Sequence, residues 1–254
     1  MPCAFLDLPR PHAFAHRGGA GHFPENTWRA FEHAVGLGYA YLETDVHATA
    51  DGVLVAFHDR TLDRVTDTAG RISELPYQVV GAARIGGTDP IPLLEDLLGA
   101  WPDIRFNIDI KDFPAVLPLA GVLSRTRAWD RVCVTSFSGR RLAAARRLLA
   151  RPVCMATSPA GVAMVRFGVP SRALAARWER MSVRCAQLPA RMTTGPVIRH
   201  AHAAGLAVHA WTVNERADMI RLLDLGVDGI MTDETALLRE VLIGRGRWHP
   251  RQAG

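Results

Sequence analysis

The sequence has few of the features that mark membrane, disulfide-rich or disordered proteins. Aromatic residues make up 7% of its 254 residues, and the four cysteines, Cys3, Cys133, Cys154 and Cys185, are too widely separated to form a metal-ligand spacing. The last three lie in apolar runs, which predicts reduced core residues. No apolar run approaches the roughly 20 residues that a membrane helix needs, and the N-terminus lacks a secretion signal. We therefore expect a soluble cytoplasmic protein without a transmembrane segment.

Acidic residues are scarce in one part of the chain. Residues 124–200 contain fifteen arginines against Asp130 and Glu179, although the net charge of the whole chain is only +5. The simpler interpretation is a set of solvated helix faces. The alternative is a basic flank that attracts anionic substrates or makes weak contact with a membrane surface. We expect no nucleic-acid partner, and the sequence carries no signal for an oligomeric state.

Short apolar runs alternate with helical patterns along the whole chain. Eight β-then-α units in about 250 residues are typical of a (β/α)8 TIM barrel, an α/β fold. The predicted strands are Ala13–His16, Ala40–Val46, Ile104–Ile110, Val132–Ser136, Val153–Ala156, Ser182–Ala186, Leu206–Trp211 and Gly229–Met231. The predicted helices include Asn26–Leu37, Leu93–Ala100, Gly139–Leu149, Val197–Ala204, Asn214–Leu225 and Asp233–Leu242, with Asn26 and Asp233 as N-caps.

One segment interrupts the alternation. Residues 49–92 are too many for an ordinary loop after the second strand. We expect a small insertion with a hairpin of its own, lying over the mouth of the barrel. Because no linker divides the remainder, residues 1–254 are predicted to form a single domain.

Polar side chains gather where the predicted strands end. His16 and Arg17 end the first strand, and Glu43 and Asp45 share one face of the second because they are two residues apart. Asp109 and Lys111 have the same relation at the end of the third strand, as do His209 and Trp211 at the seventh. Working residues of such barrels lie at the C-terminal ends of the strands, so these groups are predicted to meet in one cavity.

Three of these groups, Glu43, Asp45 and Asp109, are carboxylates that would repel one another if buried unpaired. A hard divalent cation would offset that repulsion, and oxygen-only ligation favours Mg²⁺ or Ca²⁺ over zinc. The alternative is a set of ion pairs with Arg17 and Lys111. Lys111 is the only lysine among thirty basic side chains, which indicates a position that needs a compact point charge. Phosphate oxygens beside a metal ion are a natural partner for it.

His16 and His58 are the candidate proton-transfer pair. Breaking a phosphodiester requires a nucleophile to lose a proton and a leaving alkoxide to gain one, and imidazole titrates in the range that suits both steps. We expect His16 to act as the base and His58 as the acid, whereas His209 is given no chemical role. Asp59 either orients His58 or stabilises a turn.

Other polar residues near these motifs have weaker assignments. Glu25-Asn26-Thr27 is expected to fix the loop after the first strand and cap its helix. Arg64 and Thr66, in the insertion, are candidates for substrate contact.

The motifs resemble those of the glycerophosphodiester phosphodiesterase family. The matching stretches are AHRGGAGHFPENTWRAFEHAVGLG, YLETDVHATADGVLVAFHDRTLDRVTDTAG, IPLLEDLL, FNIDIK, HAWTVN and GVDGIMTD, in the family's order. The resemblance implies a (β/α)8 barrel with an insertion after the second strand. It also implies a metal-dependent phosphoric diester hydrolase that converts a small-molecule glycerophosphodiester into glycerol 3-phosphate and an alcohol.

Carried over residue by residue, the resemblance places the catalytic histidines at His16 and His58, and the metal ligands at Glu43, Asp45 and Asp109. It places phosphate contacts at Arg17 and Lys111 and a substrate-packing tryptophan at Trp211. The third acidic position, commonly glutamate in the family, is the shorter aspartate here, which leaves the preferred ion open.

Several alternatives remain open on the sequence alone. Attack by the glycerol 2-hydroxyl in place of water would give a cyclic phosphate first. A phospholipase D-like enzyme of the same superfamily would act on lysophospholipids. A non-catalytic barrel that binds phosphorylated ligands is the third possibility.

Overall fold

The computed structural model, which describes residues 3–168 and 172–251, closes eight parallel strands into a ring. The order around the barrel is β1-β11-β10-β9-β8-β7-β6-β2, and β2 pairs with β1 to close it. All eight lie where the sequence predicts a strand. The strands are β1 His12–Ala15, β2 Tyr41–Ala48, β6 Arg105–Ile110, β7 Val132–Thr135, β8 Cys154–Ala156, β9 Val183–Pro189, β10 Ala207–Trp211 and β11 Gly229–Thr232.

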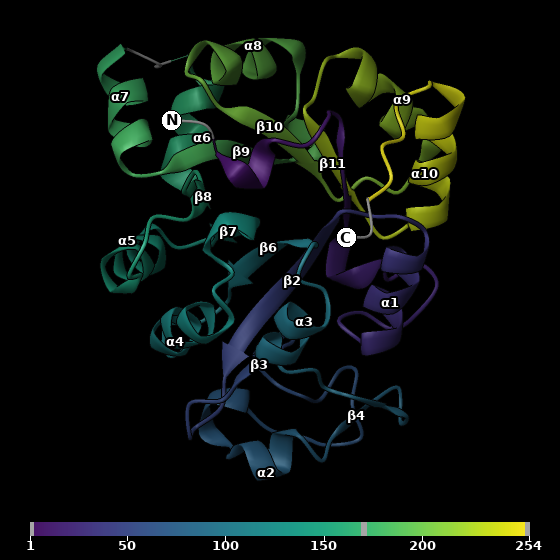
Figure 1. Cartoon of the computed structure of the whole chain (residues 1–254), viewed down its shortest axis with the longest axis vertical. Coiled ribbons are helices and arrows are strands. Elements are labelled where there is room, and N and C mark those ends of the chain that lie inside the picture. The colour runs from purple at the N-terminus through teal and green to yellow at the C-terminus, as the bar shows by residue number, and fades with distance from the viewer. Residues whose placement is uncertain (1–2, 169–171, 252–254) are drawn as a thin grey trace.

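Helices surround the strands in chain order, so that the first and last of them, α1 and α10, lie on the same side of the barrel (Figure 1). The predicted helices are present, and α4, α6 and α7 are additional to them. In α4 the helical pattern is weakened by Pro118, which lies in the first turn, where its missing N–H needs no partner. The long helices are α1 Trp28–Gly36, α3 Leu94–Ala100, α4 Val116–Thr126, α5 Gly139–Leu148, α6 Pro159–Arg166, α7 Arg172–Arg180, α8 Gly195–Ala203, α9 Arg216–Asp224 and α10 Thr235–Gly244.

The N-caps predicted at Asn26 and Asp233 are wrong, whereas the expectation that the stretch Glu25-Asn26-Thr27 caps the first helix is confirmed. The cap of α1 is Thr27, whose hydroxyl accepts a hydrogen bond from the Ala30 N–H at 3.2 Å. Asn26 precedes it with a φ of 56°, a left-handed conformation that asparagine tolerates better than most residues. The cap of α10 is Glu234 rather than Asp233. The side chains of both predicted caps are used in the site described below.

The insertion after β2 forms a small lobe with its own apolar centre, visible at the lower end of Figure 1. It contains the predicted hairpin, made by β4 and β5. Of its described residues only His58 lines the cavity at the barrel mouth, so the lobe borders the mouth on one side and does not cover it. Its elements are β3 Leu54–Ala56, η3 Ile72–Glu74, α2 Tyr77–Val80, β4 Arg84–Ile85 and β5 Asp89–Pro90.

The N-terminal ends of the strands form the floor of the barrel, which the 3-10 helix η1 (Ala4–Leu6) covers. The Phe5 ring meets the Tyr41 ring edge-on at 5.3 Å, and the Tyr41 hydroxyl donates to the Phe5 carbonyl at 2.8 Å. Because a buried hydroxyl needs a partner, this bond ties η1 to β2.

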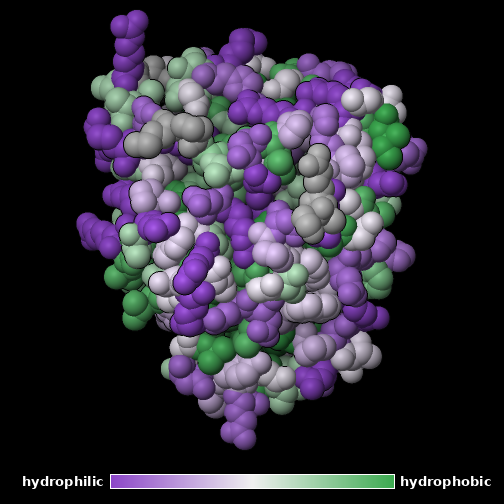
Figure 2. Space-filling view, viewed as in Figure 1, coloured by the Kyte–Doolittle hydropathy of each residue, from purple (hydrophilic) through white to green (hydrophobic). Residues whose placement is uncertain are grey.

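The arginine-rich segment 124–200 runs through the teal and green elements from α4 to α8 in Figure 1. Arg146 and Arg147 on α5, and Arg177 and Arg180 on α7, are exposed. Hydrophilic side chains project from that part of the surface in Figure 2, consistent with solvated helix faces. Within the described ranges, no helix has the length and apolar character needed to cross a bilayer.

Candidate active site

All eight predicted site residues line one cavity of about 400 Å³ at the C-terminal ends of the strands. Strand register explains the convergence, since Asp45 on β2 is the direct partner of Asp109 on β6. Residues paired in this way on neighbouring parallel strands point to the same side of the sheet. The eight are His16, Arg17, Glu43, Asp45, His58, Asp109, Lys111 and Trp211.

Lys111 bridges two of the carboxylates. Its Nζ lies 2.8 Å from Asp45 Oδ1 and 2.7 Å from Asp109 Oδ2, and Arg17 Nε lies 3.2 Å from Asp45 Oδ2. Burial alone would raise the pKa of Asp45, but the two cations outweigh it and lower that pKa. For Asp109, burial and the neighbouring Asp45 charge outweigh the cations and raise the pKa. The ion pairs with Arg17 and Lys111, which the sequence leaves as the alternative to a metal ion, are therefore formed in the protein without a metal.

Glu43 is the carboxylate with the least compensation. It accepts the Arg17 backbone N–H at 3.0 Å, and its carboxyl is almost completely buried. Burial, with the neighbouring Asp45 charge, raises its pKa to about 7. Arg17 holds its N–H in this position with a φ of 51°, a conformation that costs of order 1 kcal/mol or more in a residue with a side chain.

His16 is oriented by Asp233, which sequence reasoning assigned only to a helix cap. His16 Nδ1 lies 2.7 Å from Asp233 Oδ1, and Asp233 Oδ2 accepts from Asn214 Nδ2 at 2.8 Å. On the other side of the ring, Nε2 lies 3.9 Å from Glu43 Oε2. Burial opposes a charged imidazole, but Glu43 and Asp233 together raise the pKa of His16 above 6.5. The signal for Asp233 was its place in the matching stretch GVDGIMTD.

His58 also has a carboxylate that orients it. Asp59 contacts the imidazole, as expected if it orients His58 and does not only stabilise a turn. His58 Nδ1 lies 2.7 Å from Asp59 Oδ1. Arg64 Nε contacts the other Asp59 oxygen at 2.5 Å, and Arg64 Nη2 donates to Glu25 Oε1 at 2.6 Å. Burial lowers the pKa of His58, and the positive charges of the site lower it further.

The other weakly assigned residues support the loops. Arg64 is used in these ion pairs and lies outside the cavity lining, as does Thr66, whose hydroxyl bonds to the carbonyls of Leu62 and Thr68. Asn26 donates to Asp45 Oδ2 at 3.3 Å.

Arg141 on α5 has a supporting role that the sequence did not indicate. It donates to the Lys111 carbonyl and, at 2.8 Å, to Ser136 Oγ. These bonds tie the chain segment that carries Lys111 to the start of α5. The signal was weak, because Arg141 is one of fifteen arginines in its region.

One wall of the cavity is apolar. Phe137, after β7, meets Trp211 at the end of β10 edge-on, with ring centroids 5.6 Å apart. Val162 and Ala163 of α6 continue this wall. Phe137 is 62% exposed, which is unusual for a phenylalanine and leaves its face open to a bound group.

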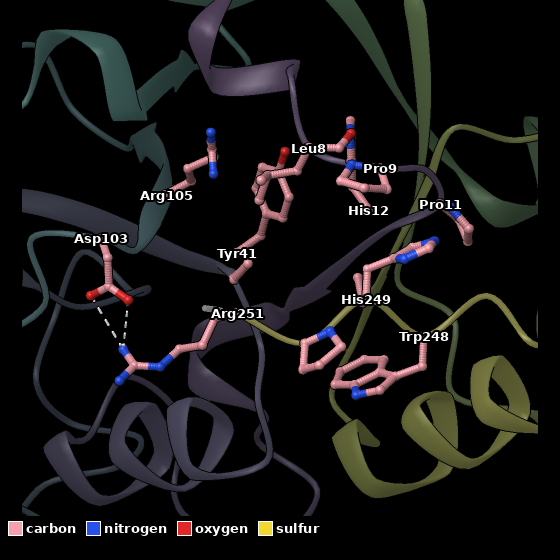
Figure 3. Close-up of a pocket in the computed structure, with 13 residues that line it drawn as sticks. Leu8, Pro9, Pro11, His12, Tyr41, Asp103, Arg105, Trp248, His249 and Arg251 are labelled. Carbon is pink, nitrogen blue, oxygen red and sulfur yellow. Dashed lines mark hydrogen bonds and ion pairs between the residues drawn. The ribbon is translucent and has the colours of Figure 1, made fainter. Parts of the chain in front are cut away.

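A second cavity, of about 410 Å³, lies at the floor of the barrel (Figure 3). Its two arginines are already paired, Arg105 with Asp7 and Arg251 with Asp103 at 3.0 Å. The other described residues that line this cavity include no cluster of carboxylates. The candidate site for phosphoester chemistry is therefore the mouth of the barrel.

The mouth fits a hard divalent cation by its donor chemistry. Its ligands would be carboxylate oxygens, and the buried Asp109 Oδ1 has no hydrogen-bond partner among the described residues. Burial and the neighbouring Asp45 charge raise the pKa of Glu43, and a bound cation would oppose both. In the described part of the chain the three carboxylates do not bring one oxygen each within 4.8 Å of one another, because the Lys111 ammonium lies between two of them.

A barrel with this site belongs to the class of phosphoric diester hydrolases. Residues 16–237 match the glycerophosphoryl diester phosphodiesterase family, and the chain belongs to that family. It is 46% identical over 246 residues to "Probable glycerophosphodiester phosphodiesterase 2" of Mycobacterium tuberculosis, covering 93% of this chain and 92% of that protein. It is 29% identical to lysophospholipase D GDPD1 of Homo sapiens, covering 90% and 85%.

Among solved structures, the chain is similar to an Oleispira antarctica phosphodiesterase in complex with the product sn-glycerol-3-phosphate. The TM-score is 0.79 and the identity 23%, over 92% of this chain and 97% of that one. The likeness confirms the barrel fold.

Proposed function

We propose that the protein hydrolyses glycerophosphodiesters to glycerol 3-phosphate and an alcohol, with a divalent metal ion and with His16 and His58 as the proton-transfer pair. The observation that carries this proposal is that both imidazoles line one cavity with Glu43, Asp45 and Asp109. Proton transfer at two oxygens of one phosphate requires two such groups around a common centre.

The three carboxylates would hold the ion, and oxygen donors favour Mg²⁺ or Ca²⁺. When bound, it would act as a Lewis acid toward a phosphate oxygen. The test is turnover in EDTA, with each ion added back separately. Activity that persists without any added ion would contradict metal dependence.

Arg17 and Lys111 would supply fixed positive charge beside the phosphate, where negative charge grows as the ester bond breaks. Both already lie beside these carboxylates in the metal-free protein. Trp211 and Phe137 would pack against the apolar part of the substrate.

The charges of the protein alone favour a protonated His16 and a neutral His58. Because a metal ion on Glu43 would offset the charge that raises the pKa of His16, we keep His16 as the base and His58 as the acid in the proposal. Asp59 and Asp233 fix one nitrogen of each ring and leave the other free for the substrate.

The direct test compares His16→Ala and His58→Ala with His22→Ala, an exposed histidine outside the site. We expect both site variants to lose about 100-fold or more in turnover, the range that general acid–base catalysis contributes, and the control to keep it. Retention of about a tenth of the activity by either site variant would rule out its assignment. Phosphorus NMR during turnover would separate attack by water from attack by the glycerol hydroxyl, which gives a cyclic phosphate first.

The apolar wall favours one second candidate, a lysophospholipase D activity. Phe137 and the α6 residues lie beside the phosphate end of the cavity, where an acyl chain could pack. Cleavage of a lysophospholipid, with no turnover of glycerophosphocholine, would favour this candidate. The reverse result would leave the glycerophosphodiester proposal.

We also propose a cytoplasmic location, because all four cysteines are unpaired thiols, as is usual in a reducing compartment. Fractionation of cells that express the full chain would test this.

A further inference from the structure

Three cysteines that are far apart in the sequence meet at the floor of the barrel. Cys133, Cys154 and Cys185, named the floor cysteines here, come from the adjacent strands β7, β8 and β9. They offer three Sγ atoms that all lie within 4.8 Å of one another. Among the described residues, this is the tightest group of three side chains of metal-binding type that the barrel contains.

Strand register produces the group. Cys133 is the direct partner of Cys154, and Ala156, two residues on, is the partner of Cys185. A register shift after Met155 brings Cys185 to the same level. Local spacing could not reveal such a site, because each ligand comes from a different β/α unit. The prediction of reduced core residues, made from the apolar runs around these cysteines, is confirmed.

The sulfur separations fit a metal ion better than a covalent bond. Cys133 Sγ lies 3.8 Å from Cys185 Sγ, whereas a disulfide needs about 2.05 Å. In a tetrahedral zinc site with Zn–S bonds of about 2.3 Å, neighbouring sulfurs lie about 3.8 Å apart.

Two further groups point to this centre. Cys3, beside η1, makes a hydrogen bond with Cys154, which lowers the pKa of the Cys3 thiol. His209 is fully buried on β10 and interacts with the Cys185 thiol, whose pKa is lowered by Cys133, Cys154 and His209.

We propose that Cys133, Cys154 and Cys185 bind one thiophilic metal ion, of the class of Zn²⁺, and that Cys3, which contacts Cys154 but lies outside this group of three, moves in as the fourth ligand when the ion binds. Each coordinating thiol gives up its proton to solvent as the thiolate–metal bond forms, and no electron is transferred. His209 stands beside the site as a group that can hydrogen bond to a coordinated sulfur.

Such an ion would act as a structural clasp. It would join three neighbouring strands and, through Cys3, hold η1 against the floor, which has no other covalent tie. The three floor cysteines are buried, and none of them lines the cavity of Figure 3. The three thiols lie directly beneath the mouth cavity, since Gln187, which lines that cavity, contacts Cys185 Sγ at 3.9 Å. The soft thiols and the hard carboxylates would select different ions.

The test uses the full chain, purified with a reducing agent, passed over a chelating resin and analysed for metal by mass spectrometry. We expect one zinc ion per chain to be retained, and Co²⁺ in its place to give the intense thiolate-to-cobalt charge-transfer absorption. Cys133→Ser and Cys3→Ser should lose the ion and lower the melting temperature. The matched control is Ala207→Ser, which places a hydroxyl at the partner position of Cys185 without removing a thiol, and it should retain the ion.

If a cysteine variant fails to fold, the cobalt titration of the unaltered chain still decides. Four freely titrating thiols in the unfolded chain, together with no retained zinc and no charge-transfer band, would overturn the proposal and leave a packed thiol core. A mass lower by two hydrogens would overturn it in favour of a disulfide. Neither result would affect the hydrolase assignment, which rests on the carboxylates and imidazoles that line the mouth cavity.

Discussion

Replacing Glu43 by glutamine should stabilise the metal-free protein at alkaline pH while removing its activity. The Glu43 carboxyl is buried beside Asp45, so its pKa rises from 4.5 to about 7 on folding. A folded-state pKa above the unfolded value means that the folded state binds the proton more tightly. The stabilisation that Glu43 gives is therefore full below about pH 4.5 and is lost as the pH rises through about 7.

The expected size follows from the two pKa values. At about 1.4 kcal/mol for each pH unit, the full effect is about 3 to 4 kcal/mol, and most of it is lost between pH 5 and pH 8. Glutamine has no charge at either pH. In EDTA, the free energy of unfolding of Glu43→Gln should therefore gain about 2 to 3 kcal/mol on that of the unaltered protein between these two pH values.

The assay is urea unfolding in EDTA at several pH values, with Glu32→Gln, an exposed position on α1, as the control. A second series with Mg²⁺ or Ca²⁺ should stabilise the unaltered protein at pH 8 and have little effect on Glu43→Gln, because a bound cation takes the place of the proton. Parallel pH curves for the two proteins in EDTA would refute the reasoning, since they would mean that Glu43 is ionised without strain in the folded state.

Three further changes test other parts of the site. Asp233→Asn should lower the pKa of His16, which would move the corresponding limb of the pH profile of kcat/KM to lower pH and reduce turnover by about 100-fold; an unmoved limb would contradict the assignment of His16. Lys111→Arg should also lose activity, because a planar guanidinium cannot replace the ammonium between two aspartates; normal turnover would show that only charge matters. Gly18→Ala should lower the free energy of unfolding by about 2 kcal/mol in urea, since a Cβ there would lie 2.8 Å from Ala30 Cβ at a φ of 84°, and an unchanged midpoint would show that the loop can move.

Periodicity was sufficient for the barrel because each strand and helix is defined by residues close together in the sequence. The pattern of residues 41–48 predicted a buried strand with Glu43 and Asp45 on one face. In the structure Tyr41–Ala48 is a strand in which every residue is buried. The predicted helix caps were wrong because asparagine and aspartate side chains suit both an N-cap and a contact in the site. Only the fold shows that Asn26 contacts Asp45 and that Asp233 contacts His16.

The sequence by itself determined the eight strands, the order of the elements and the set of acidic, basic and imidazole groups at the strand ends, because these depend on local patterns. The tertiary structure decided what depends on register between distant segments. It placed Asp233 against His16 and Lys111 between two aspartates, and it set the insertion beside the mouth. It also gathered the floor cysteines, since neighbouring strands of a barrel are separated in the chain by a whole helix and its loops.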